Sequence, residues 1–402
     1  MKKRILMIAP ASIPINGAEH IVNAKLLQAF SLDGHFEIDL VTKRNKWEHY
    51  PSKSNLNENI NLRSLSIIEV DNKLTISTIW QHFLSLLCFG VVFKGAHWAV
   101  KALPIVKNLI SQNQYDFVLT KDTPSLLLGY YLKKKYGVKW VATWNDPYPV
   151  SKYPHPYGLG LHAKTTLVDK LQIRMMKKWV DVHIFPSKRL SDYMNNYLNV
   201  SSDKIRIIPH VVLPNQKQVK ESLDDTLRFI HSGNLKHPRN PSLFIKGVLD
   251  FVTKYPNKKI EISILGVYDK IFNEEIKKRK LESVFKFINP VPYDESLILL
   301  NNYHVALIIE AQCEEGIFLP TKVSDFMQCG KHIFAISPIN GVLHDLYTEK
   351  CISYFSSNAD YKAISNEINR IYDDFVNGKM VCMPSVKPEF SYINIVQQYH
   401  LI

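Results

Sequence analysis

The feature that most constrains the fold is an alternation of short, unbroken apolar runs with helical segments. In the first half of the chain, strands are predicted at residues 4–9, 36–41, 116–120, 139–143, 182–185 and 205–208. Runs of this kind, without alternating polar residues, indicate parallel strands that are covered by helices on both faces. Strand, helix and strand in succession form a right-handed crossover unit. The first half therefore predicts a doubly wound parallel sheet.

The second half begins the same alternation again. Its strands are predicted at residues 227–231, 260–265, 285–288, 305–309 and 332–336. A chain of 402 residues is too long for one ordinary core, and residues 209–225 form a polar stretch with two prolines that is typical of a linker. We therefore predict an α/β protein of two Rossmann-like domains that face a cleft, over 1–210 and 226–387, with a final helix in 388–402 packed back on the first domain.

The net charge of +13 indicates an anionic partner. Nucleic acid, a phosphorylated substrate and an acidic membrane surface would each fit, but the chain has no basic helix or aromatic platform of the nucleic-acid-binding kind. We therefore expect no nucleic-acid partner. The five cysteines are scattered, without metal-ligand spacing, which predicts reduced thiols in a cytoplasmic protein and no metal site.

The most apolar window of the chain is residues 76–93. Its length is close to that of a membrane span, but Gln81 and His82 lie inside it, and Lys94 follows it. We predict a helix that is either buried or turned towards a membrane, rather than a span. A second helix is predicted over residues 96–112, and the pair could lie against a membrane surface.

Ligands of doubly wound sheets bind in the loops that follow the carboxyl ends of the strands. The first such loop holds Gly17 at a helix start, without the GxGxxG pattern of dinucleotide sites; a simple tight turn is the alternative. The loop at 231–241 holds Arg239 and other cations that suit a diphosphate, or that form only a solvated basic loop. At a third strand end, Asp146 could orient a hydroxyl, act as a base or cap the next segment.

The stretch EEGIFLPTKVSDFMQCG at residues 314–330 combines several of these features. A helix is predicted to start with Pro320 just inside its first turn, and it carries Lys322 and Asp325 on one face. Free backbone N–H groups, the helix dipole and a lysine suit a phosphate, whereas the carboxylate suits sugar hydroxyls. An amphipathic helix with a surface ion pair would give the same pattern.

Four segments together resemble the GT-B glycosyltransferases of the large retaining family 4 type. They are the NGAE turn with its helix and following strand, VDVHIFPSKRLSDYM followed by KIRIIPHVV, FIHSGNLKHPRNPSLFIKG, and LPTKVSDFMQCGKHIFAIS. The last is the most specific, because it resembles the family's P-x-K-x-x-E/D variant. The resemblance covers nearly the whole chain, and it implies an acceptor-side first domain and a donor-binding second domain.

The resemblance also implies roles for individual residues. Lys322 and Arg239 would neutralise the donor diphosphate, Asp325 would hold the ribose, and Asp146 would lie at the acceptor cleft as a third catalytic residue. The other implied contacts to the donor are Gly17, Gly233, Asn234, Lys236, Pro292, Glu315, Phe318, Leu319, Pro320 and Thr321. Gly17 would be the glycine of close approach on the acceptor side, and Asn16, Glu19 and Asn145 are the implied acceptor contacts.

Three positions depart from the family pattern. Asn234 replaces an arginine, so that Lys236 would have to substitute for it in binding the diphosphate. Ile317 stands where the E-x7-E pattern has its first glutamate, which leaves Glu314 or Glu315 for the sugar contact. Asn145 replaces a histidine. These departures leave the donor's identity open.

The resemblance implies transfer of a sugar from a UDP- or GDP-linked donor to an acceptor hydroxyl with retention, without a cofactor or a metal. The basic, partly apolar first domain suggests a lipid-linked or oligosaccharide acceptor at the inner membrane face, and hence a role in a bacterial surface polysaccharide such as O-antigen, lipopolysaccharide or capsule. The alternatives are a non-hydrolysing sugar-nucleotide epimerase and a non-catalytic, membrane-associated carbohydrate-binding subunit.

Overall fold

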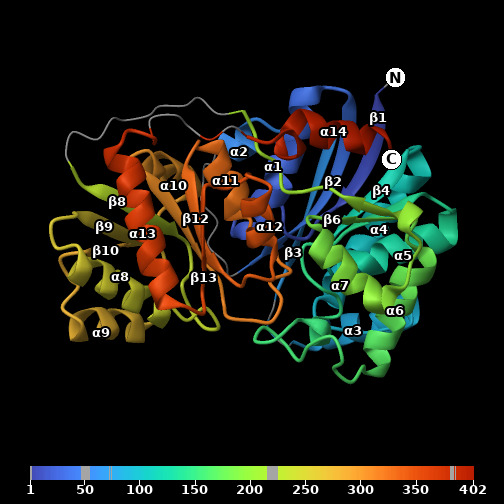
Figure 1. Cartoon of the computed structure of the whole chain (residues 1–402). Helices are drawn as coiled ribbons and strands as arrows, with labels where there is room; N and C mark the ends of the chain where they lie inside the picture. Colours follow the sequence, from blue (N-terminus) through green and yellow to red (C-terminus); the bar gives the residue numbers. More distant parts are fainter. Residues whose placement is uncertain are drawn as a thin grey trace. The chain divides into compact units, whose positions relative to one another are not determined.

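The computed structural model describes residues 2–46, 55–71, 73, 75–214, 225–380, 384 and 386–402. The chain forms two compact units, each built on a parallel sheet with helices (Figure 1). Unit 1 comprises Met1–Tyr153, Gly158–Val211 and Glu389–Ile402, and unit 2 comprises Pro154–Tyr157 and Val212–Pro388. The predicted α/β class with two doubly wound sheets is confirmed. Residues 215–224 of the predicted linker lie outside the described residues.

Unit 1 has a seven-stranded sheet in the order β3-β2-β1-β4-β5-β6-β7. The order reverses between β1 and β4, where doubly wound sheets bind their ligands. Its strands are β1 (Lys3–Ile8), β2 (Phe36–Asn45), β3 (Ser64–Val70), β4 (Phe117–Lys121), β5 (Trp140–Thr143), β6 (Val182–Phe185) and β7 (Ile205–Ile207). Its helices are α1 (Ala18–Asp33), α2 (Asn55–Glu58), α3 (Ile76–Phe89), α4 (Ala96–Gln112), α5 (Ser125–Tyr136), α6 (Leu167–Trp179), α7 (Lys188–Leu198) and α14 (Tyr392–His400).

Unit 2 has a six-stranded sheet in the order β10-β9-β8-β11-β12-β13, which reverses between β8 and β11. Its strands are β8 (Leu227–Ser232), β9 (Ile260–Leu265), β10 (Phe285–Ile288), β11 (Val305–Ile309), β12 (His332–Ser337) and β13 (Tyr354–Ser357). Its helices are α8 (Ser242–Lys254), α9 (Lys270–Lys278), α10 (Tyr293–Leu300), α11 (Lys322–Gln328), α12 (Val342–Thr348) and α13 (Tyr361–Val376).

The edge strands β3 and β13 are absent from the sequence prediction. An edge strand is covered less completely, so its sequence need not be a continuous apolar run. In β3 every second side chain is exposed to solvent, and two of the four residues of β13 are serines. The local sequence does not predict these two strands. Each forms by pairing with its inner neighbour, β3 with β2 and β13 with β12.

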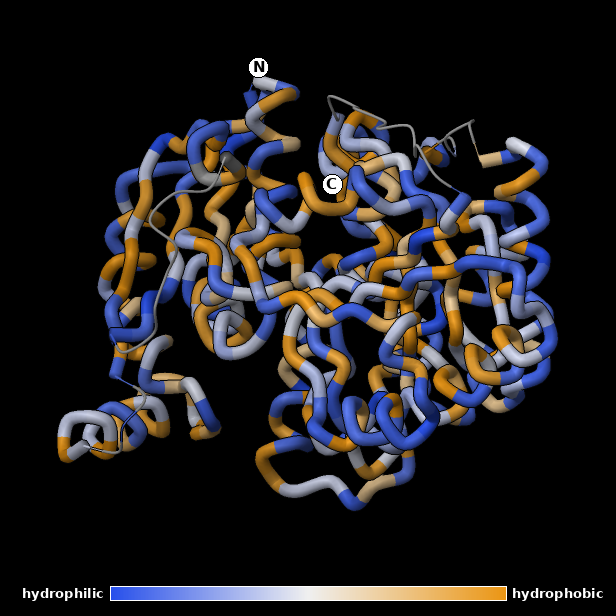
Figure 2. The backbone as a smooth tube through the Cα atoms, turned by 90° about the vertical axis from the view of Figure 1, so that its left-hand side faces the viewer, coloured by the Kyte–Doolittle hydropathy of each residue, from blue (hydrophilic) through white to orange (hydrophobic). Residues whose placement is uncertain are grey.

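Hydrophobic and hydrophilic residues alternate along the helices (Figure 2), as expected where one helix face packs on a sheet. The last helix, α14, belongs to unit 1, where it packs on α1. The ring of Tyr399 meets that of Phe30 edge-on with centroids 5.1 Å apart, and Nε2 of His400 lies 3.0 Å from the Asp33 carboxylate. The helix α14 thereby adds to the helical layer that α1 forms in unit 1.

The helix α3, from the most apolar window of the sequence, packs in an unusual way. Its buried residues are Thr78, Ser85 and Phe89, whereas most of its large apolar side chains are exposed. Within the described ranges of the chain, no helix is long and apolar enough to cross a membrane.

The contact between α5 and β5 gives a test of the packing in unit 1. Gly129 lies against Trp140, and an added Cβ would come within 2.3 Å of the indole. Trp140 is fully buried, and its Nε1 donates a hydrogen bond of 2.8 Å to Thr120. We predict that Gly129→Ala lowers the free energy of unfolding by about 2 kcal/mol, although alanine favours helices. Denaturant unfolding measures this.

The matched control is Lys134→Ala on the exposed side of the same helix. It should change the free energy of unfolding by less than about 0.5 kcal/mol. Equal stability of the Gly129→Ala variant and the wild type would contradict the described packing.

Candidate active site

The loops after β8 and β9 meet the first residue of α11 in unit 2. Gly233 follows β8 with a φ of +116°, and a Cβ added to it would lie 2.5 Å from Nζ of Lys322. Gly266 follows β9 with a φ of +129°, and its Cβ would lie 2.6 Å from the carbonyl oxygen of Gly233. Positive φ favours glycine. The two glycines therefore allow the lysine amine to approach the backbone at the strand ends.

Lys322 lies next to a second cation. Burial and the positive charge of Arg239 lower the pKa of Lys322 to about 8, although Glu310 and Asp325 oppose the shift. Nη2 of Arg239 lies 3.4 Å from Oε1 of Glu310. Two cations that repel each other in a confined place favour an anion between them, because the anion relieves the repulsion.

His231, the next-to-last residue of β8, adds no charge to this place. The side chain is buried, and its Nδ1 lies 3.2 Å from the carbonyl oxygen of Leu307. Burial, followed by the charges of Lys322 and Arg239, holds its pKa well below the usual value. His231 is therefore neutral at pH 7, and the positive charge at these strand ends comes from Lys322 and Arg239.

Asp325 lies one turn after Lys322 and is mostly buried. The hydroxyl of Tyr293 donates a hydrogen bond of 2.7 Å to its Oδ1. Burial and the negative charge of Asp325 raise the pKa of Tyr293 well above its usual value, so the phenol stays a donor. Tyr293 is the first residue of α10, directly after Pro292. The sequence prediction included Pro292 but missed Tyr293, which holds the carboxylate in place.

The predicted start of α11 is wrong by two residues. Pro320 lies before the helix rather than in its first turn, Thr321 is the N-cap, and the helix runs over Lys322–Gln328. Leu319 is buried, and Phe318, Pro320 and Thr321 are partly exposed. The alternative of a Lys322–Asp325 surface pair does not fit, because the Asp325 carboxylate is buried against Tyr293.

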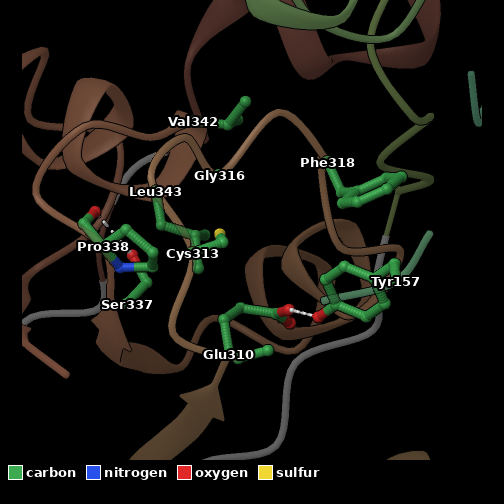
Figure 3. A pocket seen from close by; sticks show the side chains of 10 residues that line it. Tyr157, Glu310, Cys313, Gly316, Phe318, Ser337, Pro338, Val342 and Leu343 are labelled. Atoms are coloured by element: carbon green, nitrogen blue, oxygen red, sulfur yellow. Dashed lines mark hydrogen bonds between the residues drawn. The ribbon is translucent and has the colours of Figure 1, made fainter. Parts of the chain in front are cut away.

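A pocket lies beside the loop that leads from β11 to α11 (Figure 3). The side chains of Glu310 and Tyr157 point towards each other, and the phenol donates a hydrogen bond of 3.1 Å to Oε2. The ring of Phe318 stands edge-on to Tyr157 with centroids 5.1 Å apart. The full lining is Tyr157, Glu310, Ala311, Cys313, Gly316, Phe318, Ser337, Pro338, Val342 and Leu343.

Backbone hydrogen bonds fix this loop to the segment before α12. The N–H of Gly316 donates to Asn340 and the N–H of Val342 donates to Gly316, both at 2.8 Å. Ile317 is fully buried, so its position in the E-x7-E pattern serves the core and not a sugar. Glu315 is half-buried near the pocket, and Asn234 and Lys236 are exposed in the loop after β8.

The predicted acceptor residues gather in unit 1 at the ends of β1 and β5. Gly17 precedes α1 with a φ of +141°, and Asn16 beside it is exposed. The amide of Asn145 donates a hydrogen bond to Oε1 of Glu19, in the first turn of α1. Desolvation of the carboxyl and the charge of Glu19 raise the pKa of Asp146 to about 6, although the residue as a whole is exposed.

Two further ionisable residues, which the sequence prediction missed, belong to this cluster. Lys121 ends β4 and is buried, which lowers its pKa. Asp122 follows it, and burial together with Glu19 raises its pKa well above the usual value. The signal was available, because both residues follow an apolar strand next to the switch point. The result is a pair of carboxyls with raised pKa values, Asp122 and Asp146, at the ends of the neighbouring strands β4 and β5. Functional sites often have such groups.

Residues 85–215 match the model of Glycosyltransferase Family 4. HepE of Anabaena in complex with UDP is similar to the chain with a TM-score of 0.65 at 14% identity, over 100% of this chain and 99% of that one. The lipopolysaccharide outer core galactosyltransferase WaaB has a TM-score of 0.60 at 12% identity, over 99% of each chain. Sucrose-phosphate synthase of Thermosynechococcus elongatus has a TM-score of 0.62 at 12% identity, over 100% of this chain and 99% of that one. No curated protein matches the sequence significantly.

The chain has the GT-B fold. The predicted resemblance is thereby confirmed. At these identities the solved structures support the fold alone, so the activity, the retention of configuration and the roles of individual residues stay predictions. Among the residues predicted for the donor, the structure brings Gly233, Lys322, Arg239 and Asp325 together in unit 2. It brings Glu19, Asn145 and Asp146 together in unit 1.

Gly233→Ala tests the approach of Lys322 to the backbone. We predict that the added methyl group displaces the amine and weakens binding of UDP at least about tenfold, the effect of losing one charge-assisted contact. Isothermal titration calorimetry measures the affinity.

Gly137→Ala is the matched control, because Gly137 also has a positive φ, +70°, but nothing lies within 4 Å of an added Cβ. Both variants should lose about 1 kcal/mol of stability from backbone strain, and the control should keep its affinity. Full affinity in the Gly233→Ala variant would contradict the described arrangement.

Proposed function

We propose that the protein is a glycosyltransferase, and that it moves a sugar from a nucleoside diphosphate donor to an acceptor hydroxyl with retention at the anomeric carbon. The observation that carries the proposal is the arrangement in unit 2, where Lys322 approaches Gly233 next to Arg239 and one helical turn before Asp325. Such an arrangement offers positive charge to a diphosphate and a carboxylate to a hydroxylated ring.

The donor contacts follow from this arrangement. Lys322 and Arg239 receive the two phosphates. Asp325, oriented by Tyr293, accepts hydrogen bonds from the ribose hydroxyls. The loop Phe318–Thr321 and Glu315 lie next to the sugar. HepE has been crystallised with UDP and with UDP-glucose, which makes UDP the first nucleotide to test.

The same cations would assist the chemical step. The bond between the anomeric carbon and the phosphate oxygen breaks, the acceptor oxygen bonds to that carbon on the same face, and the acceptor proton leaves with the diphosphate. Negative charge grows on the leaving oxygen, and fixed cations stabilise it there. The proposal needs no metal, because Lys322 and Arg239 supply this charge. The cluster of Glu19, Asn145 and Asp146 would bind the acceptor hydroxyls.

We further propose a lipid-linked glycan as the acceptor, at the inner membrane face, in the assembly of a bacterial surface polysaccharide. The net charge of +13 favours an anionic carrier or membrane. WaaB, a lipopolysaccharide galactosyltransferase, has the same fold. A peripheral association would allow the protein to reach such an acceptor from the cytoplasm.

The direct test is a screen of nucleotide sugars for slow donor hydrolysis, followed by NMR of the anomeric configuration of the product. We predict that one donor is consumed and that the product keeps the donor's configuration. An inverted product would refute retention. A donor sugar epimerised without transfer would favour the epimerase alternative, and the absence of nucleotide binding in the folded protein would favour the non-catalytic one.

The pKa of Lys322 predicts a pH dependence of donor binding. The pKa of Lys322 is about 8. Raising the pH from 7 to 9.5 therefore removes the charge of this lysine in the protein without ligand. Affinity for UDP should therefore fall on the order of tenfold as the pH rises. Calorimetry at several pH values measures it.

Lys322→Gln is the comparison for this experiment. Its affinity should be low at pH 7 and should not fall further up to pH 9.5. Its free energy of unfolding at pH 7 should be no lower than that of the wild type, because the buried charge is gone. A wild-type affinity independent of pH would contradict the role of Lys322.

A further inference from the structure

The helix α3 has its apolar side turned outwards. The side chains of Ile76, Trp80 and Leu87 are 89%, 58% and 66% exposed, and those of Ile79, Phe83 and Leu86 are about half exposed. The side that packs on unit 1 instead carries Thr78 and Ser85. A helix on a globular protein ordinarily buries its apolar stripe and exposes its polar one. The reversal in α3 therefore indicates a contact with something outside this unit.

The attachment of α3 shows that this orientation is specific. The hydroxyl of Ser85 donates a hydrogen bond of 2.8 Å to the carbonyl of Val91, and Phe89 packs in the core cluster that includes Trp98 of α4. The N-terminus has a capping box formed by Thr75 and Thr78. Polar groups thus hold the inner side, so turning the helix over would leave them unpaired.

The exposed face has the composition of an interfacial helix. Trp80 and Phe83 stand side by side with ring centroids 5.4 Å apart, and the exposed residues recur at the spacing of one helix face (Ile76, Ile79, Trp80, Phe83, Leu86 and Leu87). Aromatic side chains are favoured at the boundary between lipid and water. With 14 residues, α3 is about 21 Å long, shorter than the roughly 30 Å of a bilayer core, so it would lie in the membrane surface.

The segment that holds α3 and α4 carries charges of one sign. Residues 72–115, which include α3 and α4, contain Lys73, Lys94, Lys101 and Lys107 but no aspartate or glutamate. Lys73 and Lys94 are exposed. An anionic lipid surface would be attracted to this segment, at about 1 kcal/mol for each lysine near the surface. A second copy of the same surface would bring lysines towards lysines, which disfavours self-association.

We infer that α3 docks unit 1 on an anionic lipid bilayer, with Trp80, Phe83 and Leu87 inserted among the lipid headgroups and acyl chains. The inference deepens the membrane association proposed above, and it rests on exposure and charge in unit 1 and not on the donor site. Docking through α3 would hold the protein at the surface where a lipid-linked acceptor is found.

The experiment is sedimentation of the full-length protein with vesicles of phosphatidylcholine alone or mixed with phosphatidylglycerol. The wild type should bind the mixed vesicles, bind the neutral ones at least about tenfold more weakly, and lose affinity as salt is added. The variant Trp80→Gln/Phe83→Gln/Leu87→Gln should bind the mixed vesicles at least about tenfold more weakly than the wild type.

A matched control exists in unit 2. Ile271, Ile298 and Val376 are 69%, 67% and 64% exposed on separate helices, so the triple substitution of these residues by glutamine removes comparable apolar surface. This control should bind vesicles as the wild type does. Both triple variants should unfold at the wild-type temperature and bind UDP with wild-type affinity, which separates a failure of docking from a failure of the proposed donor site.

Three results would overturn the inference: vesicle binding that the α3 substitutions leave unchanged, no binding of the wild type to mixed vesicles, or an equal loss in the control variant. Sedimentation velocity without lipid tests the other occupant. If the α3 substitutions convert a wild-type dimer into a monomer and leave vesicle binding unchanged, the surface is an interface between copies and not a lipid contact.

Discussion

The candidate donor site depends on a charge that the folded protein holds at a cost in free energy. Burial and Arg239 lower the pKa of Lys322 from 10.5 to about 8, so charging this amine at pH 7 costs on the order of 3 kcal/mol relative to the unfolded chain. The sign follows from proton binding: between pH 8 and 10.5 the unfolded state binds more protons, so stability rises with pH there. A diphosphate between the two cations would offset this cost, which makes the strain a source of affinity.

The backbone determines where this charge lies. Gly233 and Gly266 both have positive φ, and each leaves room that a Cβ would fill. Tyr293 holds Asp325 from the neighbouring helix, and Glu310 is shared between Arg239 and Tyr157. Arg239, Glu310 and Asp325 are therefore each held by a group on another element, so that these side chains need little rearrangement to receive a ligand.

The local sequence predicted the inner strands, because covered parallel strands are continuous apolar runs. The spacing of Lys322 and Asp325 predicted that these two residues lie on one face of a helix. It could not predict residues whose position depends on tertiary packing. Tyr157 lies far along the chain from Glu310, and no local pattern announces that contact. Gly266 directly follows a predicted strand, so a positive φ at this position could have been predicted from the sequence. The edge strands β7 and β10 were predicted, whereas β3 and β13 were missed because polar residues interrupt their apolar runs.

The same limit explains α3. Hydropathy measures how strongly a segment avoids water. It does not show whether the segment contacts the protein core or a surface outside the protein. In residues 76–93 the apolar residues would fit a buried helix equally well. Two observations separate the cases: the structure buries Thr78 and Ser85 in place of the apolar side chains, and residues 72–115 contain no aspartate or glutamate. A buried helix has no need of a basic surrounding, whereas a helix at an anionic surface gains from it at every lysine. Charge around an apolar segment is thus the sequence signal that distinguishes an outward face from a core.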